Sequence, residues 1–357
     1  MGLMLACALA AALLAYMAAV PATRLAIAWA RRGAGLDHAN ERSSHTVPTP
    51  RLGGVGVAAG IAAVAPLPLL FPALGEAPGA VAVPLPWAAV FATTAAAFAV
   101  GLWDDLRSLG PLPKLAALLA VSALAPALGL APAVLPAGLP PLVNALLAAA
   151  VVFALMNMVN FMDGINGMAG RIGQLAALGL LLAHAGHAGM GALCAVAGAL
   201  CGACMAFLLF NLGDAKTFLG DCGAHAIGAM IACLLLASLM RGGQHPVPPA
   251  VYLLLVFPGL FDIGFTMLRR ALRGEAVWRP HRSNLYQRHL IATGGDHART
   301  MDWYLPFLAT ASLGAVALAR LAEFLRTPLL LTGASLALCA AIAAAQLRGV
   351  ARAEALR

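Results

Sequence analysis

Two adjacent carboxylates lie at the end of an apolar run, within the segment GLWDDLRSLGPLPK (101–114). Asp104 and Asp105 are followed by Arg107 and Lys114. Adjacent carboxylates at a membrane boundary are costly unless they bind a metal, bind another cation or move protons. The neighbouring cations can in turn attract an anionic substrate. The segment therefore indicates a site for a metal or for an anion.

A second polar group occurs in NMVNFMDGINGMAG (157–170), where another apolar run ends. It holds Asn157, Asn160, Asp163 and Asn166. Successive members are three positions apart and would share one face of a continuing helix. The Asp-Gly and Asn-Gly steps instead predict that the helix unwinds at this point. Side-chain packing alone explains this many polar groups poorly, so the segment indicates a binding or catalytic site.

The segment FLGDCGAHAIG (218–228) places Asp221 between Gly220 and Gly223, just before an apolar run resumes. Glycines let the backbone approach a ligand closely, and a helix N-terminus favours anions. A carboxylate at such a position can hold a hard cation. The pattern is typical of a metal and phosphate site, whereas His225, one turn later, is typical of a packed residue.

Two further segments combine cations with groups that can bind a sugar or a base. One is LDHANERSSHTVPTPRLGGVG (36–56), in which Arg51 precedes the pair Gly53-Gly54. The other is the long hydrophilic stretch 269–302. Arginines can hold a diphosphate, while amide and aromatic side chains can contact a base or a sugar. The candidates from the second stretch are Arg279, His281, Arg282 and Gln287.

The rest of the chain is apolar enough to position these segments at a membrane surface. Hydrophobic residues make up 62% of the sequence, charged residues 10%, and the mean hydropathy is +0.89. We therefore predict an all-α integral membrane protein with a single domain over residues 1–357 and about ten or eleven spans. The spans are expected near 3–22, 53–72, 86–103, 114–131, 140–158, 167–184, 189–211, 223–240, 249–268, 303–321 and 328–346; twelve would also fit.

The loops divide into a basic set and a set with few cations. Only Arg241, Arg320 and Arg326 fall in the second set. The positive-inside rule then predicts a periplasmic N-terminus and a cytoplasmic C-terminus. The loops expected to form the active site face the cytoplasm and lie near 31–52, 103–114, 157–168, 212–223 and 269–302. Loop cations account for the net charge of +8, so we expect no nucleic-acid partner.

In this order, the five segments resemble the polyprenyl-phosphate N-acetylhexosamine-1-phosphate transferases, glycosyltransferase family 4, from about residue 37 to residue 290. The resemblance implies transfer of a sugar 1-phosphate from a UDP-N-acetylhexosamine to undecaprenyl phosphate with release of UMP. It also implies a Mg²⁺ cofactor, for which Mn²⁺ can stand in, and a multi-pass protein of the bacterial inner membrane. Membrane lipid is an expected partner, and relatives suggest a homodimer.

The family's motifs assign roles to individual residues. The D-D pair matches Asp104 and Asp105, N-x-x-N-x-x-D-G-x-N-G matches 157–167, and F-x-G-D-x-G matches 218–223. By resemblance, Asn160 and Asp221 are metal ligands, Asn166 lies near the uracil, and Lys114 lies near the lipid phosphate. The expected catalytic residues are Asp104, Asp105 and Asp163. The expected substrate-binding residues are Arg51, Lys114, Asn157, Asn166, Arg279, His281, Arg282 and Gln287.

The last loop departs from the family's usual run of histidines, because it reads H-R-S-N-L-Y-Q over 281–287. This sequence favours the branch that initiates lipopolysaccharide O-antigen or a similar surface glycan over the phospho-muramoyl-pentapeptide transferases. The sugar stays open among GlcNAc, GalNAc, FucNAc and QuiNAc. An ion-coupled transporter is the competing class, and direct phosphoryl transfer competes with a covalent aspartyl intermediate.

Overall fold

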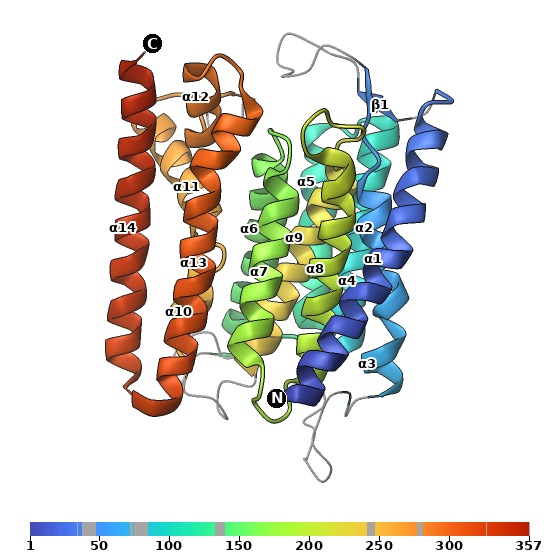
Figure 1. The fold of residues 1–357 in the computed structure, drawn as a ribbon, viewed down its shortest axis with the longest axis vertical. Helices are drawn as coiled ribbons and strands as arrows, with labels where there is room; N and C mark the ends of the chain where they lie inside the picture. Colours follow the sequence, from blue (N-terminus) through green and yellow to red (C-terminus); the bar gives the residue numbers. More distant parts are fainter. Residues whose placement is uncertain are drawn as a thin grey trace.

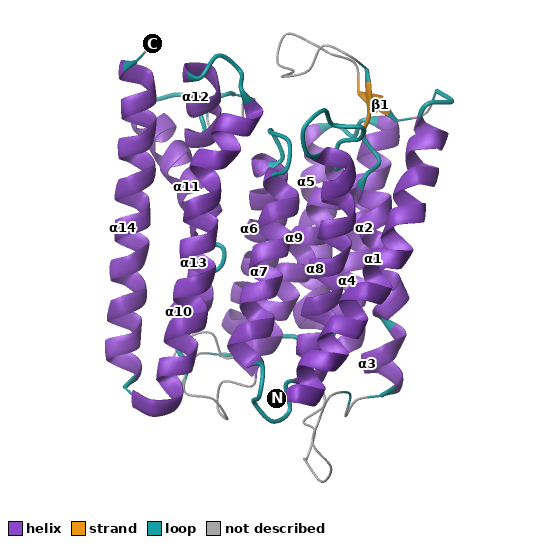
Figure 2. Ribbon diagram, viewed as in Figure 1, coloured by secondary structure: helices purple, strands orange, loops and turns teal. Residues whose placement is uncertain are grey.

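The computed structural model describes residues 1–33, 35–37, 48–71, 74, 85–132, 140–240, 247–276, 281–325 and 327–356. These residues form a helical bundle with one short β-ribbon (Figure 2). The first half of the chain contains α1 (Gly2–Ala30), β1 (Leu36–Asp37), β2 (Thr49–Pro50), α2 (Gly54–Val64), α3 (Pro66–Leu70), α4 (Trp87–Arg107), α5 (Pro111–Ala127) and α6 (Pro141–Met162). The second half contains α7 (Met168–His184), α8 (Gly191–Asn211), α9 (Gly220–Met240), α10 (Pro249–Leu254), α11 (Phe257–Leu272), α12 (Leu285–Ala292), α13 (His297–Leu325) and α14 (Pro328–Ala355).

Each predicted span coincides with one helix or with a pair of helices in series, which confirms an all-α membrane architecture. Among the described residues, seven helices are long and apolar enough to cross a membrane, namely α1, α4, α6, α8, α9, α13 and α14. The predicted spans for α13 and α14 were too short. The structure extends α13 back to His297 and α14 forward to Ala355. Hydropathy detects the apolar middle of a helix, whereas backbone hydrogen bonding continues into its polar ends.

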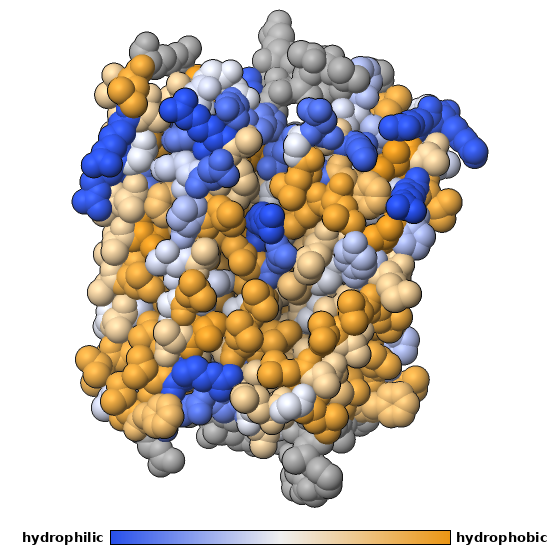
Figure 3. All heavy atoms as spheres, in the orientation of Figure 1, coloured by the Kyte–Doolittle hydropathy of each residue, from blue (hydrophilic) through white to orange (hydrophobic). Residues whose placement is uncertain are grey.

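The two chain termini lie at opposite ends of the bundle (Figure 1). The end that carries the C-terminus also carries the β-ribbon, α12 and the connections α4–α5, α6–α7 and α8–α9 (Figure 1). We call it the β1–α12 end. Hydrophilic residues gather mainly there, and apolar residues cover most of the remaining face in view (Figure 3). All the segments with candidate chemistry therefore meet at one end of the molecule.

The centre of the bundle is formed by α8 and α9. In the apolar window of α9, 94% of the residues are buried, compared with 22% in the window of α14. Small residues allow this close packing, because a Cβ added to Gly202 would lie 2.0 Å from the Ala12 backbone oxygen of α1. Helices in lipid associate through such backbone contacts, since the hydrophobic effect does not drive them together.

The starts of α2 and α9 are joined through their backbones. The amides of Gly53 and Gly54 donate to the carbonyls of Phe218 and Leu219 at 2.9 and 2.8 Å. A Cβ on Gly54 would lie 2.2 Å from the Gly223 nitrogen, so only glycine permits this crossing. The crossing places the first turn of α9 at the β1–α12 end, beside the Arg51 segment.

Candidate active site

Four residues from four helices meet at the β1–α12 end. The ammonium of Lys114, on α5, lies 2.8 Å from Asp104 Oδ2 on α4 and also donates to Asp221 Oδ2 on α9. The Asn160 amide, on α6, donates to Asp221 Oδ1. We call Asp104, Lys114, Asn160 and Asp221 the polar cluster. It unites the predicted acceptor-side residues with the two predicted metal ligands.

A tight connection between α4 and α5 brings Lys114 back to Asp104. Helix α4 ends at Arg107, and the amide of Leu109 donates to Asp104 Oδ1 at 2.6 Å. Pro111 then occupies the first turn of α5, where its missing N–H costs nothing. Lys114 therefore lies on the first turn of the returning helix, and its side chain is 24% exposed.

Asp105 is directed to the backbone of α9. Its side chain is buried, and its two oxygens accept the amides of Asp221 and Cys222 at 3.0 and 2.9 Å. The Arg51 guanidinium donates to the Asp105 backbone carbonyl. Two of the α9 N-terminal amides are thus already bonded to a carboxylate of the protein. In the structure Asp105 positions the start of α9, and with it Asp221. Its catalytic role stays a prediction.

Gly220, the first residue of α9, explains how these groups fit together. Its φ is +74°, in the left-handed region that favours glycine. A Cβ there would lie 2.1 Å from the Arg51 carbonyl oxygen and 2.7 Å from Asp105 Oδ2. A side chain at 220 would therefore separate Asp105 from the start of α9.

Asp163 lies at the end of α6, where the predicted unwinding occurs. The helix ends at Met162, and a turn with Gly167 at φ +85° leads into α7. Asp163 is half-buried, and desolvation raises the pKa of its carboxyl group well above the usual value. The negative charges of Asp221 and Asp105 raise it further.

Asn157 and Asn166 do not join the polar cluster through their side chains. The Asn157 amide donates to the Phe153 carbonyl of its own helix at 2.8 Å. The Asn166 amide donates to the Gly213 carbonyl at 2.7 Å, which links the α6–α7 turn to the α8–α9 connection. Asn211, which the sequence analysis did not select, supports the same link by accepting the Gly167 amide at 2.6 Å.

The predicted substrate residues of the long loop surround α12. Gln287 forms a capping box with Asn284 at the start of that helix. His281 Nδ1 lies 3.0 Å from Ser283 Oγ, while Arg282 is exposed. Burial and the charge of Arg270 lower the pKa of His281, which favours the neutral imidazole. Arg279 lies outside the described residues.

The sequence analysis missed Asp262, the residue that anchors this loop. Asp262 is fully buried on α11 and accepts the amides of Leu285 and Tyr286 at 2.6 and 3.0 Å. The Tyr286 hydroxyl then donates to the Phe161 carbonyl at 2.9 Å, next to the end of α6. A single carboxylate inside the apolar run FPGLFDIGF was the available signal.

The donor set of the polar cluster fits Mg²⁺. It offers the carboxylates of Asp104 and Asp221 and the amide oxygen of Asn160, and Mg²⁺ prefers oxygen ligands. Within the described residues, no group of three or more His, Cys, Asp or Glu is arranged to hold a metal. A Mg²⁺ ion at this cluster would be held by one or two carboxylates, and substrate phosphates and water would complete its ligands. The Lys114 ammonium bonds to both carboxylates and neutralises part of their charge.

The chain is similar in sequence to known polyprenyl-phosphate N-acetylglucosamine-phosphate transferases. The model of the family "Glycosyl transferase family 4" matches residues 87–239, which contain all four residues of the polar cluster. A decaprenyl-phosphate N-acetylglucosaminephosphotransferase of Mycobacterium tuberculosis is 29% identical over 333 residues, covering 86% of this chain and 80% of that protein. An undecaprenyl-phosphate α-N-acetylglucosaminyl 1-phosphate transferase of Haemophilus influenzae is 31% identical over 110 residues, covering 29% of this chain and 30% of that protein.

These matches agree with the motifs that the sequence analysis used for its assignment. The chain is a multi-pass α-helical membrane protein, and its segment 87–239 is similar to glycosyl transferase family 4.

Proposed function

We propose that this protein transfers N-acetylhexosamine 1-phosphate from a UDP-sugar to undecaprenyl phosphate, forming the lipid diphosphate sugar and releasing UMP. The observation that carries the proposal is the polar cluster, in which Lys114 bonds to both Asp104 and Asp221 at one end of an apolar bundle. Such a site can face a phosphate of a membrane lipid and a water-soluble donor at the same time.

In this proposal the cluster brings two phosphates together. Lys114 holds the acceptor phosphate and Asp104 positions it, while Asp221 and Asn160, together with Asp104, would hold the metal. A bound Mg²⁺ supplies charge neutralisation at the donor diphosphate. An oxygen of the lipid phosphate then attacks the β-phosphorus of the donor in line with the leaving UMP oxygen. Alignment and charge stabilisation are the main requirements of such a transfer.

Asp163 is a candidate to hold a proton near the polar cluster. Burial and the neighbouring charges of Asp221 and Asp105 raise its pKa, so it keeps a proton to higher pH than an ordinary aspartate. The acceptor phosphate is already largely ionised near neutral pH. We therefore assign Asp163 to tuning the charge of the site, and base catalysis is a minor contribution.

The long loop supports a donor-binding role near α12. Asp262 and Tyr286 fasten it to α11 and to the end of α6, close to Asp163. His281 and Arg282 precede α12 and belong to the segment proposed to contact the sugar nucleotide. The H-R-S-N-L-Y-Q sequence favours an enzyme of the bacterial inner membrane that initiates an O-antigen or a similar surface glycan.

The decisive experiment measures UMP release by the purified full-length protein. The protein receives undecaprenyl phosphate, Mg²⁺ and, in separate reactions, UDP-GlcNAc, UDP-GalNAc, UDP-FucNAc or UDP-QuiNAc. We expect UMP release with at least one donor, and none without acceptor lipid or in excess chelator. Absence of release with every donor would overturn the proposal.

A matched pair of variants tests the metal assignment. Asp221→Ala is expected to reduce turnover by about 100-fold or more, because it removes a proposed ligand of the metal that neutralises the developing negative charge. Asp302→Asn removes an exposed carboxylate on α13, outside the cluster, and should leave turnover unchanged. Near-normal turnover in Asp221→Ala would disprove the metal role. A labelled sugar phosphate trapped on the protein without acceptor would replace direct attack with a covalent mechanism.

A further inference from the structure

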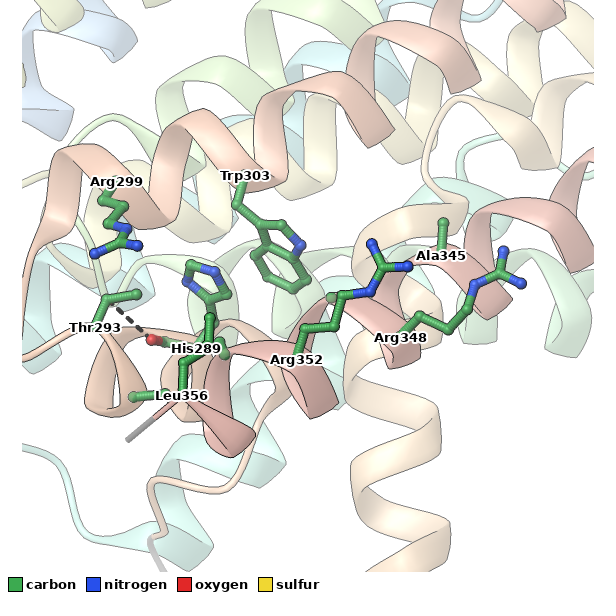
Figure 4. A pocket seen from close by; sticks show the side chains of 11 residues that line it. His289, Thr293, Arg299, Trp303, Ala345, Arg348, Arg352 and Leu356 are labelled. Carbon is green, nitrogen blue, oxygen red and sulfur yellow. Dashed lines mark hydrogen bonds between the residues drawn. The ribbon is translucent and has the colours of Figure 1, made fainter.

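A basic cavity lies between α12, α13 and α14, and it shares no residue with the polar cluster. Its volume is about 640 Å³. Arg299 comes from α13 and Arg348 and Arg352 come from α14, while His289 and Trp303 form part of its wall. Figure 4 shows Arg299 on one side of the two rings and the α14 arginines on the other.

The cavity is basic, and its arginines have no ion-pair partner among the described residues. None of its lining residues is acidic. Among the described residues, no carboxylate forms an ion pair with the guanidinium of Arg299, Arg348 or Arg352. The neighbouring acid, Glu354, is already held by a bidentate pair with Arg288 at 2.7 and 2.8 Å. The cavity therefore offers three arginines to an anion from outside the chain.

Two stacked rings form part of the wall of the cavity. The His289 and Trp303 rings are stacked with centroids 4.3 Å apart and planes 3° apart. His289 is buried, and its Nδ1 lies 3.2 Å from the Thr300 hydroxyl. The aromatic face beside the arginines gives this cavity a defined shape. A group of charges that is simply exposed to solvent has no such shape.

The position of the cavity suits a ligand with both polar and apolar parts. Arg348 and Arg352 are four residues apart, on one face of α14, just after its apolar stretch. Ala345 and Leu356 add apolar surface to the lining. The positive-inside rule explains why cations occur in this region, but it does not explain why they converge on one cavity.

We propose that this cavity binds a phosphate group, and that the ligand which carries it is an anionic membrane lipid. Arginine forks match phosphate oxygens, and basic pockets between membrane helices bind lipid headgroups. The same chemistry would also accept a soluble phosphate compound, so the experiment separates the two sources. The inference does not depend on the transferase proposal, because none of its residues belongs to the polar cluster.

Native mass spectrometry of the purified full-length protein in detergent provides the test. The protein is titrated with phosphatidylglycerol, with phosphatidylcholine or with inorganic phosphate, and the bound ligand is counted. The variant Arg348→Gln with Arg352→Gln removes two charges from the cavity. The control variant Arg31→Gln with Arg32→Gln removes two exposed charges from the end of α1, at the same end of the molecule. Size-exclusion profiles check that each variant is folded.

We expect phosphatidylglycerol to bind more tightly than phosphatidylcholine. The cavity variant should bind it about 30-fold more weakly, from about 1 kcal/mol for each arginine, while the α1 variant should match the unmodified protein. The variant Arg348→Lys with Arg352→Lys should keep much of the affinity for phosphatidylglycerol, because both positive charges are retained. Phosphate binding without lipid selectivity would assign the site to a soluble phosphate compound. Equal phosphatidylglycerol binding by the cavity and α1 variants would overturn the proposal.

Discussion

At the scale of single residues, Lys114 determines the charge balance of the candidate site. Its ammonium lies between the carboxylates of Asp104 and Asp221, which are 13% and 24% exposed. Two carboxylates this close repel each other without a cation between them. The same ammonium can turn toward a phosphate when a metal takes over the carboxylates. Lys114 therefore links the stability of the site to its proposed chemistry.

Replacing this lysine should affect stability and activity together. We expect Lys114→Gln to lower the free energy of unfolding by about 1–3 kcal/mol in chelator, since charged partners are left unsatisfied. Turnover should fall by about 100-fold. Thermal unfolding with and without Mg²⁺ checks this, and Mg²⁺ should stabilise the variant more than the unmodified protein. The control Arg24→Gln removes an exposed cation from α1, outside the expected active-site loops, and equal losses in both variants would contradict the bridging role.

Asp163 should give the protein a measurable pH dependence. Its pKa is raised in the folded state above the usual value of 3.8, so the folded protein keeps a proton that the unfolded chain has lost. Stability should therefore fall as the pH rises from about 3.8 through the raised pKa. In Asp163→Asn this loss is absent, so the variant should be more stable than the unmodified protein at neutral pH.

The measurement for Asp163 is a series of unfolding midpoints in chelator between acidic and neutral pH. The stability advantage of Asp163→Asn should shrink toward zero as the pH approaches 4. An advantage that is constant across the series would show that the substitution acts through packing. That result would rule out the raised pKa of Asp163 as the cause of the stability difference.

At the scale of elements, the α2–α9 crossing positions the first turn of α9. A glycine pair such as Gly53-Gly54 lets the backbone approach a ligand or a neighbouring helix. In the structure Gly54 faces Gly223, and the amides of Gly53 and Gly54 donate to the carbonyls of Phe218 and Leu219. These glycines therefore serve helix contact, which in turn places Asp221 opposite Lys114.

Gly54→Ala tests this crossing. The added methyl group would lie 2.2 Å from the Gly223 nitrogen, so α2 and α9 must separate. We expect a loss of about 1–3 kcal/mol in stability, together with reduced UMP release as Asp221 shifts. Gly333→Ala on α14 is the control, since a Cβ there meets nothing within 4 Å. Full activity in Gly54→Ala would show that the crossing is not needed to position Asp221.

At the scale of the whole molecule, the bundle has a hydrophilic end, which carries the candidate site, and an apolar body. The β1–α12 end carries the polar cluster, the α12 loop and the basic cavity, and it is the hydrophilic end of the visible face (Figure 3). The transporter alternative requires polar groups along a path through the bundle. Instead, the window of α9, at the centre, is 94% buried and mean hydropathy there is 2.0.

The orientation of this bundle in the membrane is a prediction that reporter fusions can check. A fluorescent protein fused to the C-terminus should fluoresce in the cytoplasm, and alkaline phosphatase inserted between α13 and α14 should be active in the periplasm. The reason is the concentration of arginine and lysine in loops on one side. The opposite pattern of reporter activity would place the β1–α12 end outside and would exclude access to cytoplasmic UDP-sugars.

The sequence alone determined the class of the fold and the end at which the chemistry gathers. Apolar runs of about 20 residues can only form spanning helices, because lipid leaves no other partner for the backbone groups. Glycine-flanked Asp221 and the Asp-Gly step at Asp163 marked two helix ends correctly. Local signals of this kind depend on neighbouring residues and survive without knowledge of the fold.

Only the tertiary structure decided which contacts the polar residues of the candidate site make. Asp104 and Asp105 are adjacent in sequence, but neighbours on a helix point about 100° apart. As a result, Asp104 faces Lys114, while Asp105 turns to the amides at the start of α9. The meeting of Asp104, Lys114, Asn160 and Asp221 joins four helices. Such contacts depend on how helices pack, which no local pattern along the chain specifies.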